Sequence, residues 1–479
     1  MTTTETAAGA ADAPPAEKAP AFSKGYRAWL LLVLLLVNVL NLADRQGIAA
    51  TAPVFKKDLQ LTDGQLGLLQ GLGFAIFYAL FSLPLALMAD RINRRKIISA
   101  CIGVFAVFAF ACGQAQNFWQ MLLFRIGIGS GDAGFGPPVS SLLGDHYPPS
   151  QRTSAMTWIW LGAPIGAVLG AVGGGWFADP INHLGWRVWF VVLSIPAAVM
   201  AVIAFLTIRE PTRGMSDPQG LAVGKPPSIP TVLRFLLSKK SFVHILMGAS
   251  LAATAMNGIG QFLNRFLVSN LHVGPAEGGQ ILGGIAGVSM AAGLALGGFG
   301  MDWLGKSDRR WYVWGPAIGL VLTTPLFIFG FMQSQLLPMI AILIAAHVTM
   351  FVYYTPTLGM AQNMVGASMR GSSAFVVSLV LGLVGVGIGP TIVGFLSDFF
   401  AQQAFGTGDF QALCRGGVAS AGAGKDAAAA CLTASATGVR HAVMAAALLG
   451  VWGALHFLLA AKDVRKDLDT YYQPDAAKA

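Results

Sequence analysis

The chain has 479 residues, of which 55% are hydrophobic and only 11% are charged, and its formal net charge is +9. Soluble domains have roughly 25% charged residues, so a water-soluble protein of this length could not cover its surface with so few charges. The basic residues gather between long apolar segments, which excludes the basic face of a soluble nucleic-acid-binding domain.

Residues 1–24 are rich in Ala, Thr and Pro and contain no apolar run, which predicts a disordered cytoplasmic tail. They do not resemble a secretory signal, because the first apolar stretch is too long for one and lacks a cleavage pattern. A membrane span needs about 20 apolar residues. Six such segments follow and predict an N-terminal six-helix bundle over residues 25–208: 27–55, 64–89, 97–113, 118–144, 153–178 and 186–208.

A proline-rich connection at residues 209–240 predicts a cytoplasmic linker between two halves. Six more apolar segments then predict a C-terminal bundle over residues 241–461, followed by a cytoplasmic tail at 462–479: 242–270, 278–303, 311–332, 336–366, 371–400 and 439–460. The expected fold is therefore an all-α integral membrane protein with twelve transmembrane helices in two six-helix bundles.

An outer loop is expected at residues 401–438, and it contains Cys414 and Cys431. A disulfide can form there if the loop faces an oxidising compartment. Sequence cannot show whether the two residues are close, so this pairing stays open. Cys101 and Cys112 lie in the third predicted span, where they are expected to be packing residues.

The distribution of Lys and Arg predicts the orientation. If the N-terminus is cytoplasmic, most of the 31 basic residues fall in cytoplasmic loops and tails. This bias places both termini inside, and it accounts for the positive net charge. We expect a multi-pass protein of the cell membrane, which is the inner membrane if the host has two.

A cluster of charged residues follows the second hydrophobic segment of each half, in Ala86–Lys96 and in Gly298–Arg310. Both clusters resemble the pattern Gly-x-x-x-Asp-Arg-x-Gly-Arg-Arg/Lys of major facilitator superfamily transporters. The first has Ala and Asn where the family usually has Gly, and the second lacks Arg after its Asp. The duplication continues, since Gly175–Asp179 is echoed by Gly394–Asp398. Such repeats place a substrate site between two bundles that rock to give alternating access.

The same resemblance implies a cytoplasmic gate. In the family pattern, the Asp of each cluster faces the N-terminal end of a helix in the opposite half, where a carboxylate is favoured. We expect these gate residues: Asp90, Arg91, Arg94, Arg152, Asp302 and Arg370. The alternative is that the clusters only set the membrane topology.

Four ionisable residues lie deep in the predicted spans: Asp44 and Arg45 in the first, and Arg125 and Asp132 in the fourth. Arg125 and Asp132 are seven residues apart and share one helix face. Intramembrane charges usually mark a transport pathway or a proton relay, so Asp44 and Asp132 are the expected proton-coupling residues. The alternative is a permanent Asp–Arg pair that only braces the bundle.

The second half is polar but nearly uncharged within its spans. Asn257, Gln261 and Asn264 form a stripe at i, i+4 and i+7, and either line a cavity or hold helices together by hydrogen bonds. We expect these residues to bind substrate: Arg45, Arg125, Asn41, Asn257, Gln261, Asn264, His347, Tyr353 and Tyr354.

The first half also resembles the Spinster family in several motifs. Asn41–Arg45 resembles that family's Asn-Tyr-x-Asp-Arg, and Arg125–Phe135 is similar to its Arg-x-x-x-Gly-x-Gly-Glu-Ala-x-Tyr. Gln65–Gln70 also fits, whereas Asp132 stands where the family has Glu. The resemblance implies transport of lysophospholipid or sphingoid lipids with proton coupling. Asn-x-x-Asp-Arg also occurs in symporters of organic anions.

The expected function is therefore proton-coupled secondary transport of an amphipathic anionic lipid. The alternatives are a proton-coupled symporter of small organic anions and a non-transporting membrane sensor. No enzyme motif, cofactor or metal-ligand spacing is recognisable, so a proton gradient is the expected driving force. The expected partners are the substrate and the bilayer, and we expect a monomer that binds no nucleic acid.

Overall fold

The computed structural model describes residues 22–89, 92–147, 149–212, 215, 229–365, 369–406, 408–419 and 424–469. These residues form helices and connecting turns, with no strand among them. The helices of the N-terminal half are α1 (Lys24–Asp58), α2 (Asp63–Gln70), α3 (Leu72–Ala89), α4 (Arg94–Cys112), α5 (Phe118–Asp132), α6 (Gly136–His146), α7 (Pro149–Trp160), α8 (Gly162–Ala178), η1 (Pro180–Asn182) and α9 (Trp186–Thr207).

The predicted linker contains a short amphipathic helix, α10, and the helices of the C-terminal half follow it. In chain order, these elements are α10 (Ile229–Leu237), α11 (Lys240–Asn270), α12 (Pro275–Ala295), η2 (Leu296–Gly300), α13 (Met301–Gly305), α14 (Trp311–Met332), α15 (Leu336–Phe351), α16 (Tyr354–Asn363), α17 (Arg370–Val380), η4 (Leu381–Ile388), α18 (Gly389–Phe405), α19 (Phe410–Leu413), η5 (Arg415–Gly417), α20 (Lys425–Ala447), α21 (Leu449–Ala460) and α22 (Val464–Asp469).

Eleven helical stretches of the described chain are long and apolar enough to cross a membrane, by length and composition alone. The predicted span 118–144 is not among them, because the turn at 133–135 divides it into α5 and α6. With α5 and α6 counted together, each half contains six such segments. The predicted all-α fold of two six-helix bundles is confirmed.

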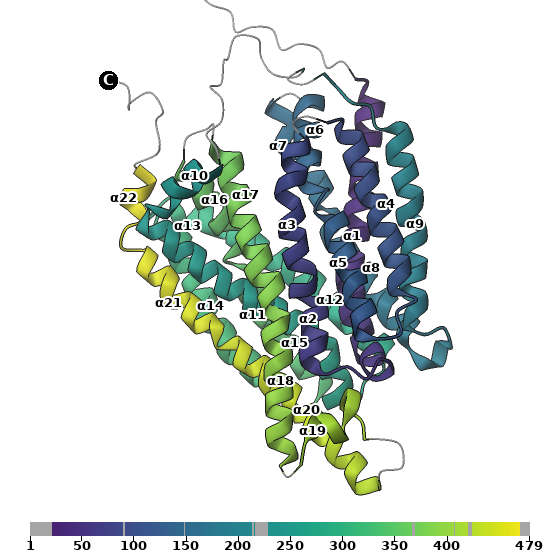
Figure 1. Cartoon of the computed structure of the whole chain (residues 1–479). Helices are drawn as coiled ribbons and strands as arrows, with labels where there is room; N and C mark the ends of the chain where they lie inside the picture. Colours follow the sequence, from purple (N-terminus) through teal and green to yellow (C-terminus); the bar gives the residue numbers. More distant parts are fainter. Residues whose placement is uncertain are drawn as a thin grey trace, which may run out of the picture.

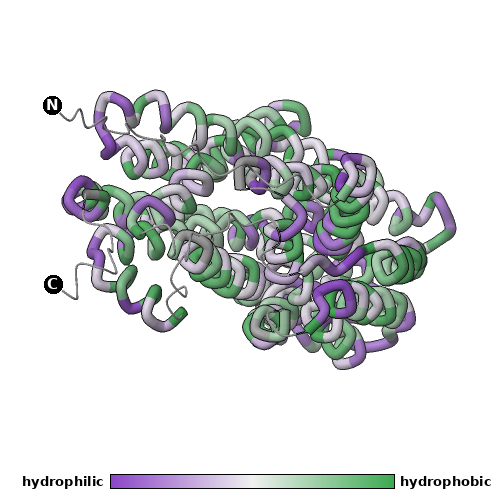
Figure 2. The backbone as a smooth tube through the Cα atoms, turned by 90° about the horizontal axis from the view of Figure 1, so that it is seen from above, coloured by the Kyte–Doolittle hydropathy of each residue, from purple (hydrophilic) through white to green (hydrophobic). Residues whose placement is uncertain are grey.

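The two bundles lie side by side and are closest at one end (Figure 1). We call this the far end; it holds the start of α2 and the end of α18. The opposite end, which we call the terminal end, holds the start of α1 together with α10 and α22, and there the bundles diverge. Seen from above, hydrophobic segments recur throughout both bundles, with hydrophilic segments among them (Figure 2).

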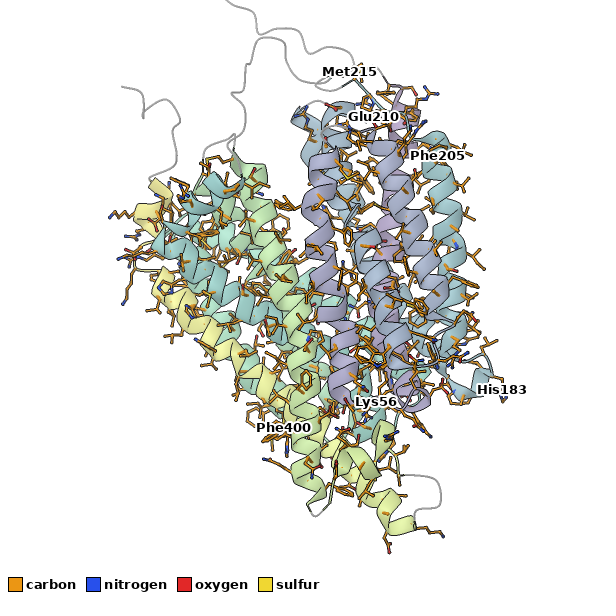
Figure 3. The ribbon with its side chains drawn as sticks, viewed as in Figure 1. Lys56, His183, Phe205, Glu210, Met215 and Phe400 are labelled. Atoms are coloured by element: carbon orange, nitrogen blue, oxygen red, sulfur yellow. A yellow bond between two sulfur atoms is a disulfide. The ribbon has the colours of Figure 1, made fainter. Side chains whose placement is uncertain are left out.

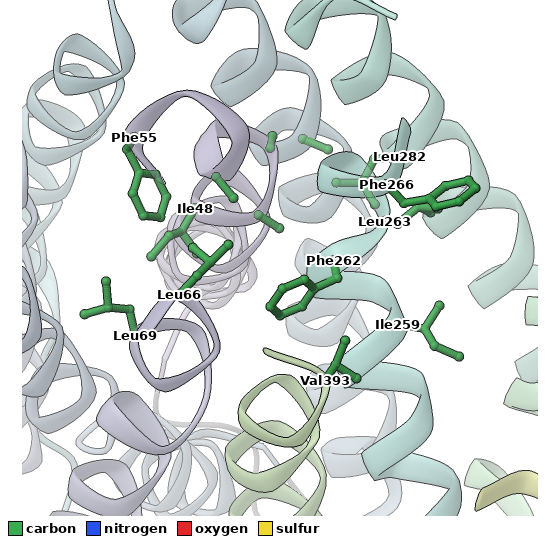
Figure 4. Close-up of a cluster of buried hydrophobic side chains, with 14 of the residues drawn as sticks. Ile48, Phe55, Leu66, Leu69, Ile259, Phe262, Leu263, Phe266, Leu282 and Val393 are labelled. Atoms are coloured by element: carbon green, nitrogen blue, oxygen red, sulfur yellow. The ribbon is translucent and has the colours of Figure 1, made fainter. Parts of the chain in front are cut away.

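A hydrophobic core joins the halves near the far end. Figure 4 shows Ile48 and Leu66 of the N-terminal half with Phe262 and Val393 of the C-terminal half, in a cluster whose members are almost completely buried. Burying apolar surface excludes water and stabilises contact between the halves. In the described chain, this seam closes the far end.

Several transmembrane segments are interrupted part of the way across. The break between α2 and α3 is at Gly71, whose φ of −113° and ψ of −104° do not continue the helix. The segment η4, between α17 and α18, is π-helical. Irregular turns of this kind often occur where helices form a functional site.

The region predicted as an outer loop, residues 401–438, is partly helical, since α18 extends to Phe405 and α20 begins at Lys425. Cys414 and Cys431 form a disulfide here, with their Cα atoms 5.5 Å apart. The possibility that the sequence left open is therefore realised. Cys101 and Cys112 are free and buried, in agreement with a packing role.

Candidate functional site

Two ion pairs connect α1 to α5 in a crossed arrangement. Arg125 Nη1 lies 2.6 Å from Asp44 Oδ2, and Arg45 pairs with Asp132. Neighbouring residues of a helix point about 100° apart, so Asp44 and Arg45 reach different partners. The aromatic ring of Phe74 lies against both guanidinium groups, with its centroid 4.5 Å from Arg45 Cζ and 5.6 Å from Arg125 Cζ.

The two pairs differ in their access to solvent. The side chains of Arg125 and Asp44 are 2% and 1% exposed, whereas that of Arg45 is 27% exposed beside an Asp132 that is 6% exposed. A fully buried pair is hard to break, because either partner alone would be an unpaired buried charge. Arg45 is the guanidinium that another anion can reach.

Arg45 and Arg125 line a pocket of about 100 Å³ between the halves. It is formed by the N-terminal helices α1, α2, α3 and α5 with α11 and η4 of the C-terminal half. The polar lining residues are Arg45, Gln46, Gln70, Arg125, Asn257 and Gln261, and the apolar ones are Leu42, Ile48, Phe74 and Val386.

Several buried polar atoms of this lining have no hydrogen-bond partner among the described residues: both side-chain amide atoms of Gln70, Oε1 of Gln261, and Nε of Arg45 and Arg125. Most buried polar groups in proteins are paired. The pocket therefore offers donors and acceptors that a ligand can use. Its walls include the end of α2 and the π-helical η4, in keeping with the interrupted helices that form many transporter sites.

The polar stripe of α11 divides between two places. Asn257 and Gln261 line the pocket, and Nε2 of Gln261 donates to the Arg45 carbonyl oxygen at 3.5 Å. Asn264 is completely buried and donates to the carbonyl oxygen of Ala50 in α1. The first two residues thus belong to the pocket, and the third connects the halves.

The other candidates for substrate binding lie outside the lining of this pocket. Asn41 is buried on α1. His347 Nδ1 lies 2.8 Å from the Leu343 carbonyl oxygen in its own helix, and its ring stacks edge-on against Phe327. Tyr353 is buried and its ring packs against that of Tyr354, which is 36% exposed.

The candidate gate residues at the terminal end contact their own half. Arg94 is buried, with Nη1 2.6 Å from Asp145 Oδ2 and Nε 2.7 Å from Glu210 Oε1; Glu210 lies at this end (Figure 3). Arg152 Nε donates to the Tyr147 carbonyl oxygen at 3.1 Å.

In the second half, Asp302 Oδ1 accepts a hydrogen bond from the Tyr312 hydroxyl at 2.9 Å. Among the described residues, Arg94 and Asp302 pair within their own half or with the adjoining linker, and Arg152 donates to Tyr147 of its own half, in keeping with the divergence of the bundles at this end (Figure 1). Asp90, Arg91 and the side chain of Arg370 lie outside the described residues.

A second charged cluster, at the far end, has no counterpart among the residues expected from sequence. Lys56 Nζ lies 2.7 Å from Asp63 Oδ1, and Arg265 Nε lies 3.6 Å from the same oxygen. Ser397 Oγ donates to Asp63 Oδ2 at 2.8 Å. Lys56 and Asp63 stand at the ends of predicted spans, where charges are usually solvated. Here both are buried, and Arg265 and Ser397 of the C-terminal half contact Asp63. Lys56 is labelled at this end in Figure 3.

Comparisons with known proteins agree with the arrangement of two bundles around a central pocket. Residues 34–390 match the family model described as Major Facilitator Superfamily. The hexuronate transporter of Bacillus subtilis is 27% identical over 77% of this chain and 87% of its own length. Protein spinster homolog 1 of Bos taurus is 26% identical, over 51% of this chain and 47% of its own length.

Among solved structures, a bacterial homologue of the human lysosomal transporter Spinster, in an inward-facing and unoccupied conformation, has a TM-score of 0.84 and 30% identity. The match covers 95% of this chain and all of the other. Since these relatives are transporters, the expectation that the protein is not an enzyme is confirmed. The chain belongs to the major facilitator superfamily of transporters, and within it the chain resembles the Spinster proteins.

Proposed function

We propose that this transporter moves an anionic molecule by proton-coupled alternating access, and that its substrate is a lysophospholipid or sphingoid-type lipid. The observation that supports this most directly is the Arg45–Asp132 pair in the pocket between the halves, in which the Arg45 side chain is partly exposed. A planar guanidinium binds a phosphate or carboxylate through two parallel hydrogen bonds.

The crossed pairs suggest how substrate and proton are coupled. An anion that binds Arg45 competes with Asp132 for the same guanidinium. A carboxylate that loses its cation in a desolvated site takes up a proton more readily. Asp132 is then the site at which the proton is loaded, and Asp44 remains held by Arg125.

The orientation follows from the basic residues, which favour a cytoplasmic terminal end. In that orientation, the closed far end faces outward and the conformation is inward-facing. The similarity to an inward-facing Spinster homologue supports this assignment. The residues expected to form the cytoplasmic gate would then meet only when the far end opens.

A small organic anion, such as a hexuronate, is the second candidate substrate. The pocket is small and six of its ten lining residues are polar, which suits a compact anion, and the hexuronate transporter is a relative over most of this chain. A lipid would place only its head group in this pocket. Its tail would then have to extend past Leu42, Ile48, Phe74 and Val386 toward the diverging ends of the bundles.

Uptake into proteoliposomes tests both candidates. Labelled lysophosphatidate and labelled glucuronate are each offered with and without a proton gradient in which the outside solution is more acidic than the lumen. We expect lysophosphatidate uptake that rises with the gradient. If glucuronate is taken up and lysophosphatidate is not, the substrate is a small organic anion instead of a lipid. Equal uptake with and without the gradient would contradict proton coupling.

A further inference from the structure

Gln70 is a buried polar residue with no role in the transport chemistry described above. It is the last residue of α2, its exposed fraction is 3%, and both atoms of its side-chain amide lack a hydrogen-bond partner among the described residues. It lines the pocket that also contains Arg45. A buried amide without a partner is unfavourable, so its place in the lining of a pocket points to a ligand.

We propose that Gln70 is a specificity residue that hydrogen-bonds a hydroxyl group next to the anionic group of the substrate. This inference rests on the proposed binding of an anion at Arg45. An amide offers both N–H donors and a carbonyl acceptor, and a hydroxyl group both donates and accepts. The unpaired Oε1 of Gln261, from the opposite half, supplies a second acceptor beside the same space.

A pair of ligands tests this proposal in the purified full-length protein. Binding of lysophosphatidate, which has a free glycerol hydroxyl, is compared with binding of its deoxy analogue. One hydrogen bond to a neutral group should make the hydroxyl form about tenfold tighter. Gln70→Leu should remove this preference, while Gln333→Leu, at a partly exposed position outside the pocket lining, should keep it.

The outcomes distinguish failure of the Gln70 role from failure of the lipid as substrate. If the protein binds neither lipid, the lipid proposal fails, and the same comparison is made with glucuronate and 4-deoxyglucuronate, which lacks the hydroxyl nearest the carboxylate. A hydroxyl preference that survives Gln70→Leu overturns the role of Gln70, whichever substrate class binds. Absence of any hydroxyl preference in the unmodified protein also overturns it.

A second inference comes from the far end, where the same contact occurs twice. Asp398, at the end of the eleventh span, accepts hydrogen bonds from the backbone N–H groups of Asp63 and Gly64 at 2.9 and 2.7 Å. Asp179, at the end of the fifth span, accepts one from the backbone N–H of Ala276 at 3.2 Å. Each carboxylate thus binds the N-terminus of a helix in the opposite half, α2 in one case and α12 in the other.

A glycine four residues before each carboxylate allows the backbones to approach. A Cβ atom on Gly175 would lie 3.0 Å from the Cα of Gly279, and one on Gly394 would lie 3.2 Å from the Cα of Gly64. These distances are shorter than ordinary van der Waals contact. The repeated sequence Gly-x-x-x-Asp therefore forms equivalent contacts in the two halves.

We infer that the two Gly-x-x-x-Asp segments are paired latches that hold the far end closed. A helix N-terminus carries partial positive charge, which a carboxylate stabilises. Both contacts cross between the halves, so they must break when the far end opens. The latch at Asp398 is reinforced, because Asp63 also binds Lys56 and Arg265.

Distance measurements between spin labels test the latches. Labels are placed at Ile181→Cys and Gln403→Cys, one in each half at the far end, with Cys101 and Cys112 replaced by Ala and the native disulfide retained. Asp179→Ala and Asp398→Ala should each raise the ratio of open to closed far ends about fivefold. The double variant should raise it further.

The control is Asp409→Ala. Asp409 also caps a helix at the far end, accepting hydrogen bonds from Gln411 and Ala412, but that helix belongs to its own half. Its variant should leave the distances unchanged. If an alanine variant does not fold, Asp179→Asn and Asp398→Asn remove the charge at constant shape and should shift the ratio in the same direction. Unchanged distances in the folded double variant overturn the latches.

Discussion

Arg125 and Asp44 form a buried ion pair, in which Nη1 lies 2.6 Å from Oδ2 and neither side chain is more than 2% exposed. The adjacent pair of Arg45 with Asp132 joins the same two helices but includes a guanidinium that is 27% exposed. Two pairs of the same chemistry therefore have different environments. This difference predicts a structural role for the first and a transport role for the second.

The two carboxylates should respond differently to substitution. Asp44→Ala leaves Arg125 buried without its partner, so it should lower the free energy of unfolding by about 3 kcal/mol. Asp132→Asn should have a small effect on stability but reduce gradient-driven uptake at least about tenfold, since the proposed proton site is lost. Thermal unfolding in detergent and proteoliposome uptake measure the two effects. Full gradient-driven uptake by folded Asp132→Asn would exclude Asp132 as the coupling residue.

Arg45 should determine the preference for anions. Arg45→Ala should weaken binding of lysophosphatidate at least about tenfold, because a charge-assisted hydrogen bond is lost. Arg45→Lys should retain part of the affinity, since Lys keeps the charge but not the planar fork. Uncharged monoacylglycerol is the matched ligand and should bind all three forms alike. Equal losses for both ligands would contradict a head-group role.

Asp308 should attach α22 to the loop before α14 in a pH-dependent manner. Hydrogen bonding from the Arg310 backbone N–H, together with Arg465, lowers the pKa of the Asp308 carboxyl below its ordinary value. A lowered pKa means that the contact is complete above the unfolded pKa, about 3.9, and is lost as the pH falls through the folded pKa.

We therefore expect hydrogen exchange of α22 to stay slow from neutral pH down to about pH 4, near the unfolded pKa, and to become faster, relative to intrinsic rates, in more acidic solution. Asp308→Asn should remove this dependence. Equal protection of α22 in the unmodified protein and in Asp308→Asn throughout the acidic range would contradict the attachment.

The Cys414–Cys431 disulfide should stabilise the packing of η5 against the N-terminal half at the far end. The bond closes a loop with a sequence separation of 17, and η5 within this loop places Gly416 beside Lys57 and Gln60 of the N-terminal half. Closing a loop of this size with a disulfide stabilises the folded protein by about 3 kcal/mol. Reduction should lower the unfolding temperature of the native protein and leave that of Cys414→Ser/Cys431→Ser unchanged. A reductant effect that persists in this double variant would have another cause.

Most of the spans and the duplication were predictable from sequence. A membrane span requires a long apolar run, and this requirement acts on local sequence without help from tertiary contacts. The motif residues Asp44, Arg45, Arg125 and Asp132 were recognisable for a related reason, because a charge within an apolar run is costly and therefore conspicuous.

The partners of these residues became known from the packing of the helices. Asp44 and Arg45 are neighbours in sequence, but the packing of α1 against α5 places Asp44 beside Arg125 and Arg45 beside Asp132. Gln70 and Asn264 look alike as polar residues in apolar helices, yet one lines the pocket and the other connects the halves. Lys56 and Asp63 belong to the buried charged cluster of the far end, where Arg265 and Ser397 of the second bundle contact Asp63. How two bundles meet depends on the shape of both surfaces, which no local pattern contains.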